Sequence, residues 1–214
     1  MGDWGSYLLN DIVMVASAGI FALSLGNLYR IAPALLRCTS IWRTSFSFER
    51  NLQLARTRDL VALTLILPFC IVADLFSLRE PALLGKCPVQ WHFAATLGLF
   101  AAFCLLRTLA HLFILCRPGT NNNNLKVAFR SDRNTFIVWG CLAVLTALIV
   151  AVLPLGEEAV KRVFMIENAV VYAFHLCRKS FILRSDHRLF PTFLYLCALE
   201  LIPVGAAVAC TLLL

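Results

Sequence analysis

Long apolar runs alternate with short polar stretches along the whole chain, and this pattern predicts a protein built from membrane-spanning helices. Six runs are long enough to cross a bilayer, because about 20 helical residues span its ~30 Å hydrocarbon core. They cover residues 8–28, 60–78, 92–116, 134–153, 159–176 and 190–214. We therefore predict an all-α polytopic fold in which residues 1–214 form one domain of six transmembrane helices.

The stretch between the first two runs, residues 29–58, is rich in arginine, and it includes Arg30, Arg37 and Arg43. Apolar residues alternate with these arginines at roughly helical spacing. This pattern predicts a basic amphipathic helix in the inner membrane interface, with its arginines on anionic lipid headgroups. Beyond Thr44, a solvated basic loop explains the pattern equally well.

The distribution of Lys and Arg predicts the orientation of the six helices. These residues are concentrated in the stretches that follow the first, third and fifth apolar runs, and the N-terminal stretch has none. Basic residues mark the cytoplasmic side of a membrane protein. Both termini are therefore predicted to lie outside.

Composition supports a membrane protein over a soluble one. The chain is 60% hydrophobic and 14% charged, whereas soluble domains are about 45–50% apolar and about 25% charged. The net charge of +7 is explained by topology and anionic lipid, so we expect no nucleic-acid partner.

The N-terminus lacks the basic region and cleavage site of a signal peptide, so we expect the first helix to remain in the mature protein. The nine cysteines are odd in number and form no CxxC motif, which favours packing residues.

Three ionisable residues lie inside the apolar runs, where a charge is costly unless it is paired or neutralised. They are Arg107, Glu167 and Glu200. At a helical rise of ~1.5 Å per residue, all three fall roughly 14–16 Å from the inner edge, near the bilayer midplane. One arginine can pair with only one of the two acids, so one acid is left without a basic partner. That acid is expected to be protonated or hydrogen-bonded to Asn168 or Tyr195.

Two histidines could extend this polar group toward the inner face. His111 shares a helix face with Arg107, and His175 shares one with Asn168. Three interpretations remain open. The charges form a buried ion pair that fixes helix register, they form a proton relay, or Arg107 extends to the inner interface.

Catalytic motifs are absent from the sequence: it contains no P-loop, GxGxxG or HExxH pattern. The four histidines fall at three different levels, so we expect no metal site, and we expect no cofactor. Whether the protein is an enzyme stays open, with a non-catalytic role favoured.

The string FLYLCALELIP, residues 193–203, resembles the C-terminal signature of an uncharacterised Bacteroidota family of polytopic membrane proteins. The matching residues are Leu194, Tyr195, Leu196, Cys197, Leu199, Glu200 and Pro203; Asn134, Thr135, Phe136, Pro154 and Arg178 match more loosely. The family has no assigned activity. The resemblance implies a multi-pass protein of the inner membrane in a Gram-negative envelope.

Two functional hypotheses follow. The first is a non-catalytic membrane protein that acts through an envelope partner or a second copy of itself. It predicts a closed core and an exposed stripe of small residues, and the candidate stripes are Gly98 with Ala102, and Ala143 with Ala147 and Ala151. The alternative is a small proton-coupled transporter or flippase, which predicts a polar cavity reaching the charges. An intramembrane enzyme acting on lipid is a third possibility.

Overall fold

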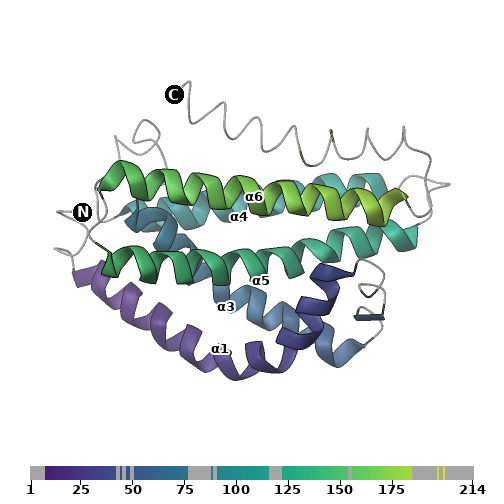
Figure 1. Ribbon diagram of the computed structural model, residues 1–214, viewed down its shortest axis with the longest axis horizontal. Helices are drawn as coiled ribbons and strands as arrows, with labels where there is room; N and C mark the ends of the chain where they lie inside the picture. The colour runs from purple at the N-terminus through teal and green to yellow at the C-terminus, as the bar shows by residue number, and fades with distance from the viewer. Residues whose placement is uncertain are drawn as a thin grey trace.

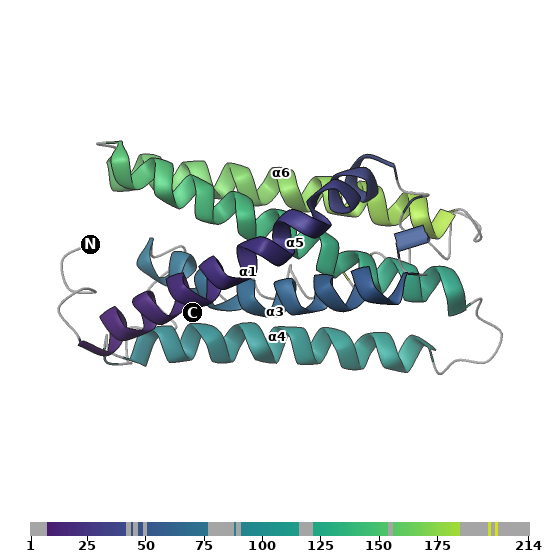
Figure 2. The same ribbon diagram turned by 90° about the horizontal axis from the view of Figure 1, so that it is seen from below.

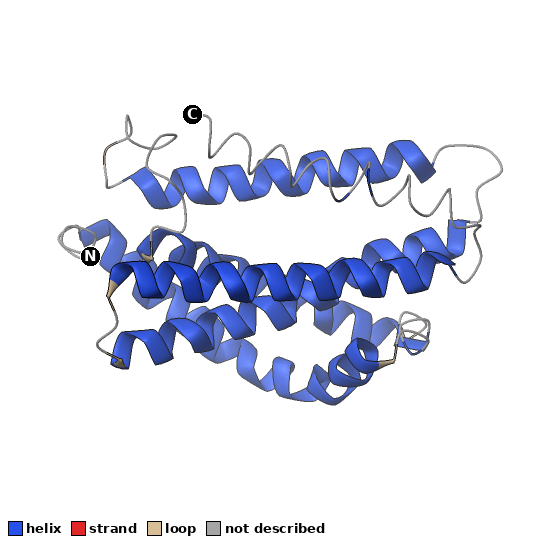
Figure 3. Ribbon diagram, turned by 45° about the horizontal axis from the view of Figure 1, so that its top comes forward, coloured by secondary structure: helices blue, strands red, loops and turns tan. Residues whose placement is uncertain are grey.

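The computed structural model describes residues 8–41, 44, 47, 48, 51–76, 88, 91–115, 122–153, 156–184, 197 and 200. Over these residues the fold consists of helices with short loops and turns, and it contains no strand (Figure 3). The helices are α1 (Leu8–Ser40), α3 (Leu52–Leu75), α4 (His92–Leu115), α5 (Asn122–Val152) and α6 (Glu157–Arg184) (Figure 1). The predicted sixth helix, residues 190–214, lies outside the described residues except for Cys197 and Glu200.

Three of these helices are long and apolar enough to cross a membrane. The candidate spans are Leu8–Ser40, His92–Phe113 and Lys126–Val152. The prediction of a helical bundle is confirmed, and three of its described helices are long and apolar enough to cross a membrane. Six crossings and their orientation stay predictions.

The bundle is centred on α3 and α5. Helix α3 packs against α1, α4 and α5, and α5 packs in turn against α6. Most of the helices run along the long axis of the molecule, and α1 crosses the others obliquely (Figure 2).

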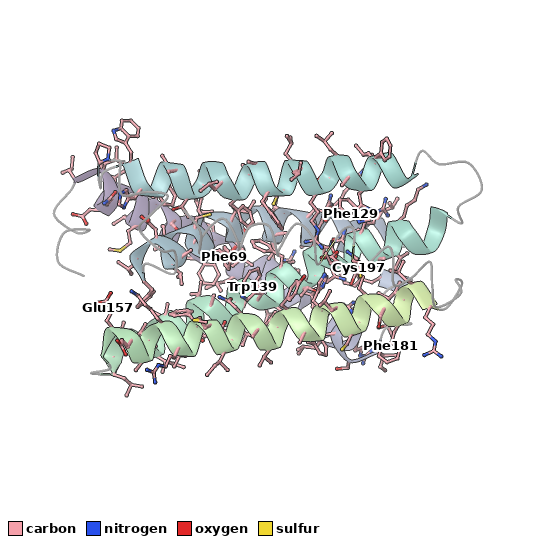
Figure 4. All side chains as sticks on the ribbon, turned by 90° about the horizontal axis from the view of Figure 1, so that it is seen from above. Phe69, Phe129, Trp139, Glu157, Phe181 and Cys197 are labelled. Atoms are coloured by element: carbon pink, nitrogen blue, oxygen red, sulfur yellow. The ribbon has the colours of Figure 1, made fainter. Side chains whose placement is uncertain are left out.

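Apolar side chains from three helices form each of the two main core clusters. One cluster joins α1, α3 and α5 around Ile31, Leu65 and Ile137. The other joins α3, α5 and α6 and includes Ala143 and Phe164. Aromatic rings connect α3 to α5, with the centroids of Phe69 and Trp139 4.7 Å apart (Figure 4).

The basic segment predicted for residues 29–58 differs from the structure. Residues 29–40 continue α1, and residues 52–58 belong to α3. Ile31, Leu35 and Cys38 recur at helical spacing and are buried, so this part of α1 packs on the bundle instead of forming a separate helix. Asn51 begins α3, because its side chain accepts hydrogen bonds from the backbone of the first turn.

Helices α5 and α6 also extend beyond their predicted spans. Helix α5 begins at Asn122 instead of residue 134, and α6 ends at Arg184 instead of residue 176. Charged residues lower the hydropathy of a run, but Lys and Arg are good helix formers and do not end a helix. These extensions place Asp132 and Lys179 inside helices, although the sequence pattern assigned both to inner loops.

Candidate functional site: a buried charge cluster

Five ionisable side chains converge between α4, α5, α6 and the segment that carries Glu200. We call them the charge cluster: Arg107 from α4, Asp132 from α5, His175 and Lys179 from α6, and Glu200. His175 and Lys179 are four residues apart, so they share one face of α6. In Figure 4, Cys197, three residues before Glu200, falls between α4 and α6.

Glu200 is bound on several sides. Nη2 of Arg107 donates hydrogen bonds to its two carboxylate oxygens over 2.5 Å and 2.6 Å. Nζ of Lys179 donates to Oε1 of the same carboxylate. The hydroxyl of Tyr172 donates to the Glu200 backbone carbonyl over 3.1 Å. Only 1% of the Glu200 side chain is exposed, so this residue joins α4 to α6 from a buried position, while 20% of the Arg107 side chain is exposed.

Asp132 completes an alternating arrangement of charges. Its carboxylate accepts hydrogen bonds from Nζ of Lys179 over 2.9 Å and 3.1 Å, and its Oδ2 lies 3.0 Å from Nη2 of Arg107. Each acid therefore contacts both bases. Two carboxylates and two cations balance when His175 is neutral, and this balance reduces the cost of keeping charge in a low-dielectric interior.

His175 faces both acids. Its Nδ1 lies 3.1 Å from the hydroxyl oxygen of Thr135. Its Nε2 lies 3.4 Å from Oδ1 of Asp132 and 3.8 Å from Oε2 of Glu200. That nitrogen is buried and has no hydrogen-bond partner among the described residues. This nitrogen could therefore bind a metal ion or accept a proton beside the two carboxylates.

The other predicted residues lie apart from these contacts. Glu167 has two buried carboxylate oxygens without a hydrogen-bond partner among the described residues. Asn168 accepts a hydrogen bond from Nε1 of Trp139 over 2.8 Å. His111 is buried, with its ring centroid 4.2 Å from that of Phe129. Arg107 thus pairs with Glu200 and not with Glu167. Asn168 bonds an indole and not an acid, while Tyr195 lies outside the described residues.

Asp132 and Lys179 were not predicted as site residues, because they occupy the basic strings RSDR and CRKS. The signal was the helical spacing that continues beyond the apolar runs. Asp132 lies one turn before Thr135, and Lys179 lies one turn after His175. Both residues continue the helical spacing of polar positions beyond the apolar runs, but this spacing alone does not place them beside Arg107 and Glu200.

A second charged contact joins α3 to α5 away from the charge cluster. Asp59 accepts hydrogen bonds from Arg133 and from Arg58. Burial raises the pKa of Asp59, but the hydrogen bonds from both arginines outweigh burial and bring this pKa below its ordinary value of 3.8. We interpret this contact as structural.

The charge cluster offers two kinds of chemistry. Its paired charges can hold helices together. One oxygen or nitrogen from each of Asp132, His175 and Glu200 also lies within 4.8 Å of the others, and this spacing could hold a metal ion.

Comparison of the chain with protein-family models, with curated proteins and with solved structures finds no match.

Proposed function

We propose that this protein is a non-catalytic, multi-pass protein of the bacterial inner membrane that acts by binding a partner helix in the envelope. The observation that carries the proposal is the direct contact of Arg107 with Glu200 at a buried position. A transport route needs an ionisable group that a substrate can reach. Here the carboxylate of Glu200 is already bound by two cations.

The surroundings of the charge cluster also favour a closed core. A groove of about 510 Å³ lies between α3 and α4, and its lining, which includes Leu67, Leu97 and Phe100, is apolar. Such a groove suits a lipid chain or an apolar side chain and not an ion. The internal ion pairs then serve to fix the packing of α4, α5 and α6.

The exposed face of α4 supplies the partner surface in this proposal. Ala94, Gly98 and Ala102 recur every fourth residue and are exposed, and a Cβ added at Gly98 would meet nothing within 4 Å. Small residues let two helix backbones approach closely within a membrane. The corresponding stripe on α5 is not available, because Ala143 and Ala147 pack inside the bundle.

Photocrosslinking in native membranes tests the partner surface. A photoreactive residue at Gly98 is expected to give one protein adduct of defined mass, either with a second copy of the chain or with one partner. The matched control is the same residue at Leu23, which is exposed on α1. Ala102→Leu should abolish the adduct without lowering the folded yield. Adducts with lipid alone, or equal adducts from both positions, would refute the proposal.

Multi-pass insertion with both termini outside is part of the proposal, supported by the three candidate spans and by the distribution of basic residues. The resemblance of residues 193–203 to the Bacteroidota family supports the inner membrane. Single cysteines at Ser47 and Gly156, in a background without other cysteines, test the orientation. A membrane-impermeant maleimide should label Gly156→Cys in spheroplasts and Ser47→Cys only after permeabilisation. The reverse pattern would invert the topology.

Proton-coupled transport is a second candidate, favoured by one observation: the unpartnered Nε2 of His175 beside two carboxylates. Reconstituted vesicles and a pH-sensitive dye distinguish the two functions. Under the partner proposal, wild-type vesicles carry no proton flux above that of empty vesicles. Flux that His175→Gln abolishes, while folded yield is unchanged, would favour transport.

A further inference from the structure

The donor atoms of the charge cluster match a transition-metal site. We propose that Asp132, His175 and Glu200 bind one divalent transition-metal ion of the Zn²⁺ class, in exchange with the ammonium group of Lys179. This inference does not rest on the proposed function, since a metal could serve either a structural or a transport role. It also departs from the expectation, based on sequence, that no metal site is present.

The type of donor is the first argument. One imidazole nitrogen and two carboxylates form a ligand set that Zn²⁺ and its neighbours favour, and three protein ligands leave a further position open. Only 8% of the His175 side chain is exposed, and its Nε2 points at the carboxylates without a hydrogen bond among the described residues. Burying such a nitrogen has a cost that a bound cation would remove.

The spacing of the donors is the second argument. Metal–ligand distances of ~2.0–2.2 Å put neighbouring ligands of a tetrahedral site about 3.3–3.6 Å apart. Nε2 of His175 lies 3.4 Å from Oδ1 of Asp132 and 3.8 Å from Oε2 of Glu200. One donor atom from each residue lies within 4.8 Å of the others. The two His175 distances are therefore close to those of a tetrahedral site, and the two carboxylate oxygens would have to approach each other when the ammonium leaves.

Lys179 marks the position of the cation. Its ammonium lies 2.9 Å from Oδ1 of Asp132 and also contacts Oε1 of Glu200. It stands in for a positive ion between two carboxylates. A divalent ion and the ammonium compete for Oδ1 of Asp132 and for the two carboxylates as a whole, although the ammonium contacts Oε1 of Glu200 and His175 lies nearer Oε2. The long, flexible lysine side chain lets the ammonium withdraw when the ion binds.

Two residues outside the donor set hold the ligands in place. The Thr135 hydroxyl lies 3.1 Å from Nδ1 of His175, the nitrogen opposite the proposed metal-binding one. Bonds of this kind fix ring orientation in metal sites. Arg107 contacts Oδ2 of Asp132 and both carboxylate oxygens of Glu200. It therefore orients both acids, and Oε2 of Glu200 would have to bind the ion beside this guanidinium group.

Titration with Co²⁺ tests the site in the full-length protein, purified in lipid nanodiscs and stripped with a chelator. Co²⁺ bound by oxygen and nitrogen in a site with few ligands has a visible absorption band. One saturable equivalent is expected. His175→Gln should weaken binding at least ~10-fold, and Thr135→Val should weaken it ~10-fold or more. Lys179→Gln should tighten binding, because it removes the competing cation.

Glu167→Gln is the matched control, because it changes a buried carboxylate on the same helix outside the charge cluster, and it should leave the affinity unchanged. Zn²⁺ should also raise the Tm of Lys179→Gln but not of the Lys179→Gln/His175→Gln double variant. If Lys179→Gln does not fold, the comparison of wild type with His175→Gln decides. The proposal is overturned if no folded form shows a saturable band, or if His175→Gln binds like the wild type.

Discussion

The guanidinium group of Arg107 lies 2.5 Å and 2.6 Å from the two carboxylate oxygens of Glu200, although 93 residues separate them in the sequence. Their contact joins α4 to a segment that also contacts α6 through Lys179 and Tyr172. The Glu200 carboxylate is buried, so leaving it without a cation, or removing it from the cations that it binds, would be destabilising. The pair therefore contributes to the packing of α4 against this segment.

Glu200→Gln should strongly destabilise the protein. It leaves Arg107 and Lys179 with Asp132 as the acid that they share, and uncompensated buried charge costs about 3–5 kcal/mol. Reversible unfolding in detergent, followed by circular dichroism, measures the loss. Glu158→Gln is the control: its carboxylate is highly exposed and pairs with Arg162 on the same helix, so the change should stay within about 0.5 kcal/mol. Equal effects would show that the Glu200 contacts do not stabilise the fold.

Substitutions at Gly140 distinguish the effect of helix propensity on stability from the effect of packing between α5 and α3. A Cβ at this position would lie 3.6 Å from Leu65, an ordinary contact between α5 and α3. Gly140→Ala should therefore be neutral or stabilising by up to ~1 kcal/mol. Gly140→Leu should destabilise by about 1–3 kcal/mol through overpacking. Gly98→Leu, in open space, should leave the Tm unchanged, and a comparable loss there would contradict the exposed α4 face.

The hydrogen bond between Trp139 and Asn168 should be measurable by substitution. Trp139→Phe keeps most of the ring contact with Phe69 but leaves the Asn168 carbonyl oxygen without its 2.8 Å donor. The expected cost is about 1–3 kcal/mol of unfolding free energy. Trp91→Phe, at an exposed position before α4, should cost far less. If Trp139→Phe is equally mild, the hydrogen bond adds little to the packing of α5 on α6.

The Asp59 contact should make part of the stability depend on pH. The pKa of Asp59 is lowered in the folded state, so its contribution is fully present above about 3.8 and is lost as the pH falls through the folded-state pKa. The side chain is 41% exposed, which limits the effect to about 1 kcal/mol or less. The stability difference between wild type and Asp59→Asn should vanish in acid. A difference that persists at low pH would refute this assignment.

The sequence predicted much of the fold because hydropathy follows burial in lipid. Three apolar runs correspond to helices that can cross a membrane. Helix ends were harder to predict, since α1, α5 and α6 continue through charged residues that hydropathy counts as loop. Packing explains the extension of α1, because its buried residues Ile31 and Leu35 contact α3.

The candidate site could be predicted only in part. The positions of Arg107, Glu167 and Glu200 inside apolar runs singled out these three residues, and two of them, Arg107 and Glu200, are in contact. Their depth in a membrane stays a prediction. The rotation of each helix about its axis was not predictable, and it separates Glu167 from Arg107 while bringing in Asp132 and Lys179. Such rotation depends on contacts between helices far apart in sequence, for which a single sequence gives no direct signal.

A double-mutant cycle on Arg107 and Glu200 tests the central claim most directly. Unfolding free energies are measured in detergent for wild type, Arg107→Gln, Glu200→Gln and the double variant. If the two charges stabilise each other within the bundle, the double variant is less destabilised than the sum of the single variants, by about 1–3 kcal/mol. Additivity within ~0.5 kcal/mol would contradict the claim that this contact holds the helices together.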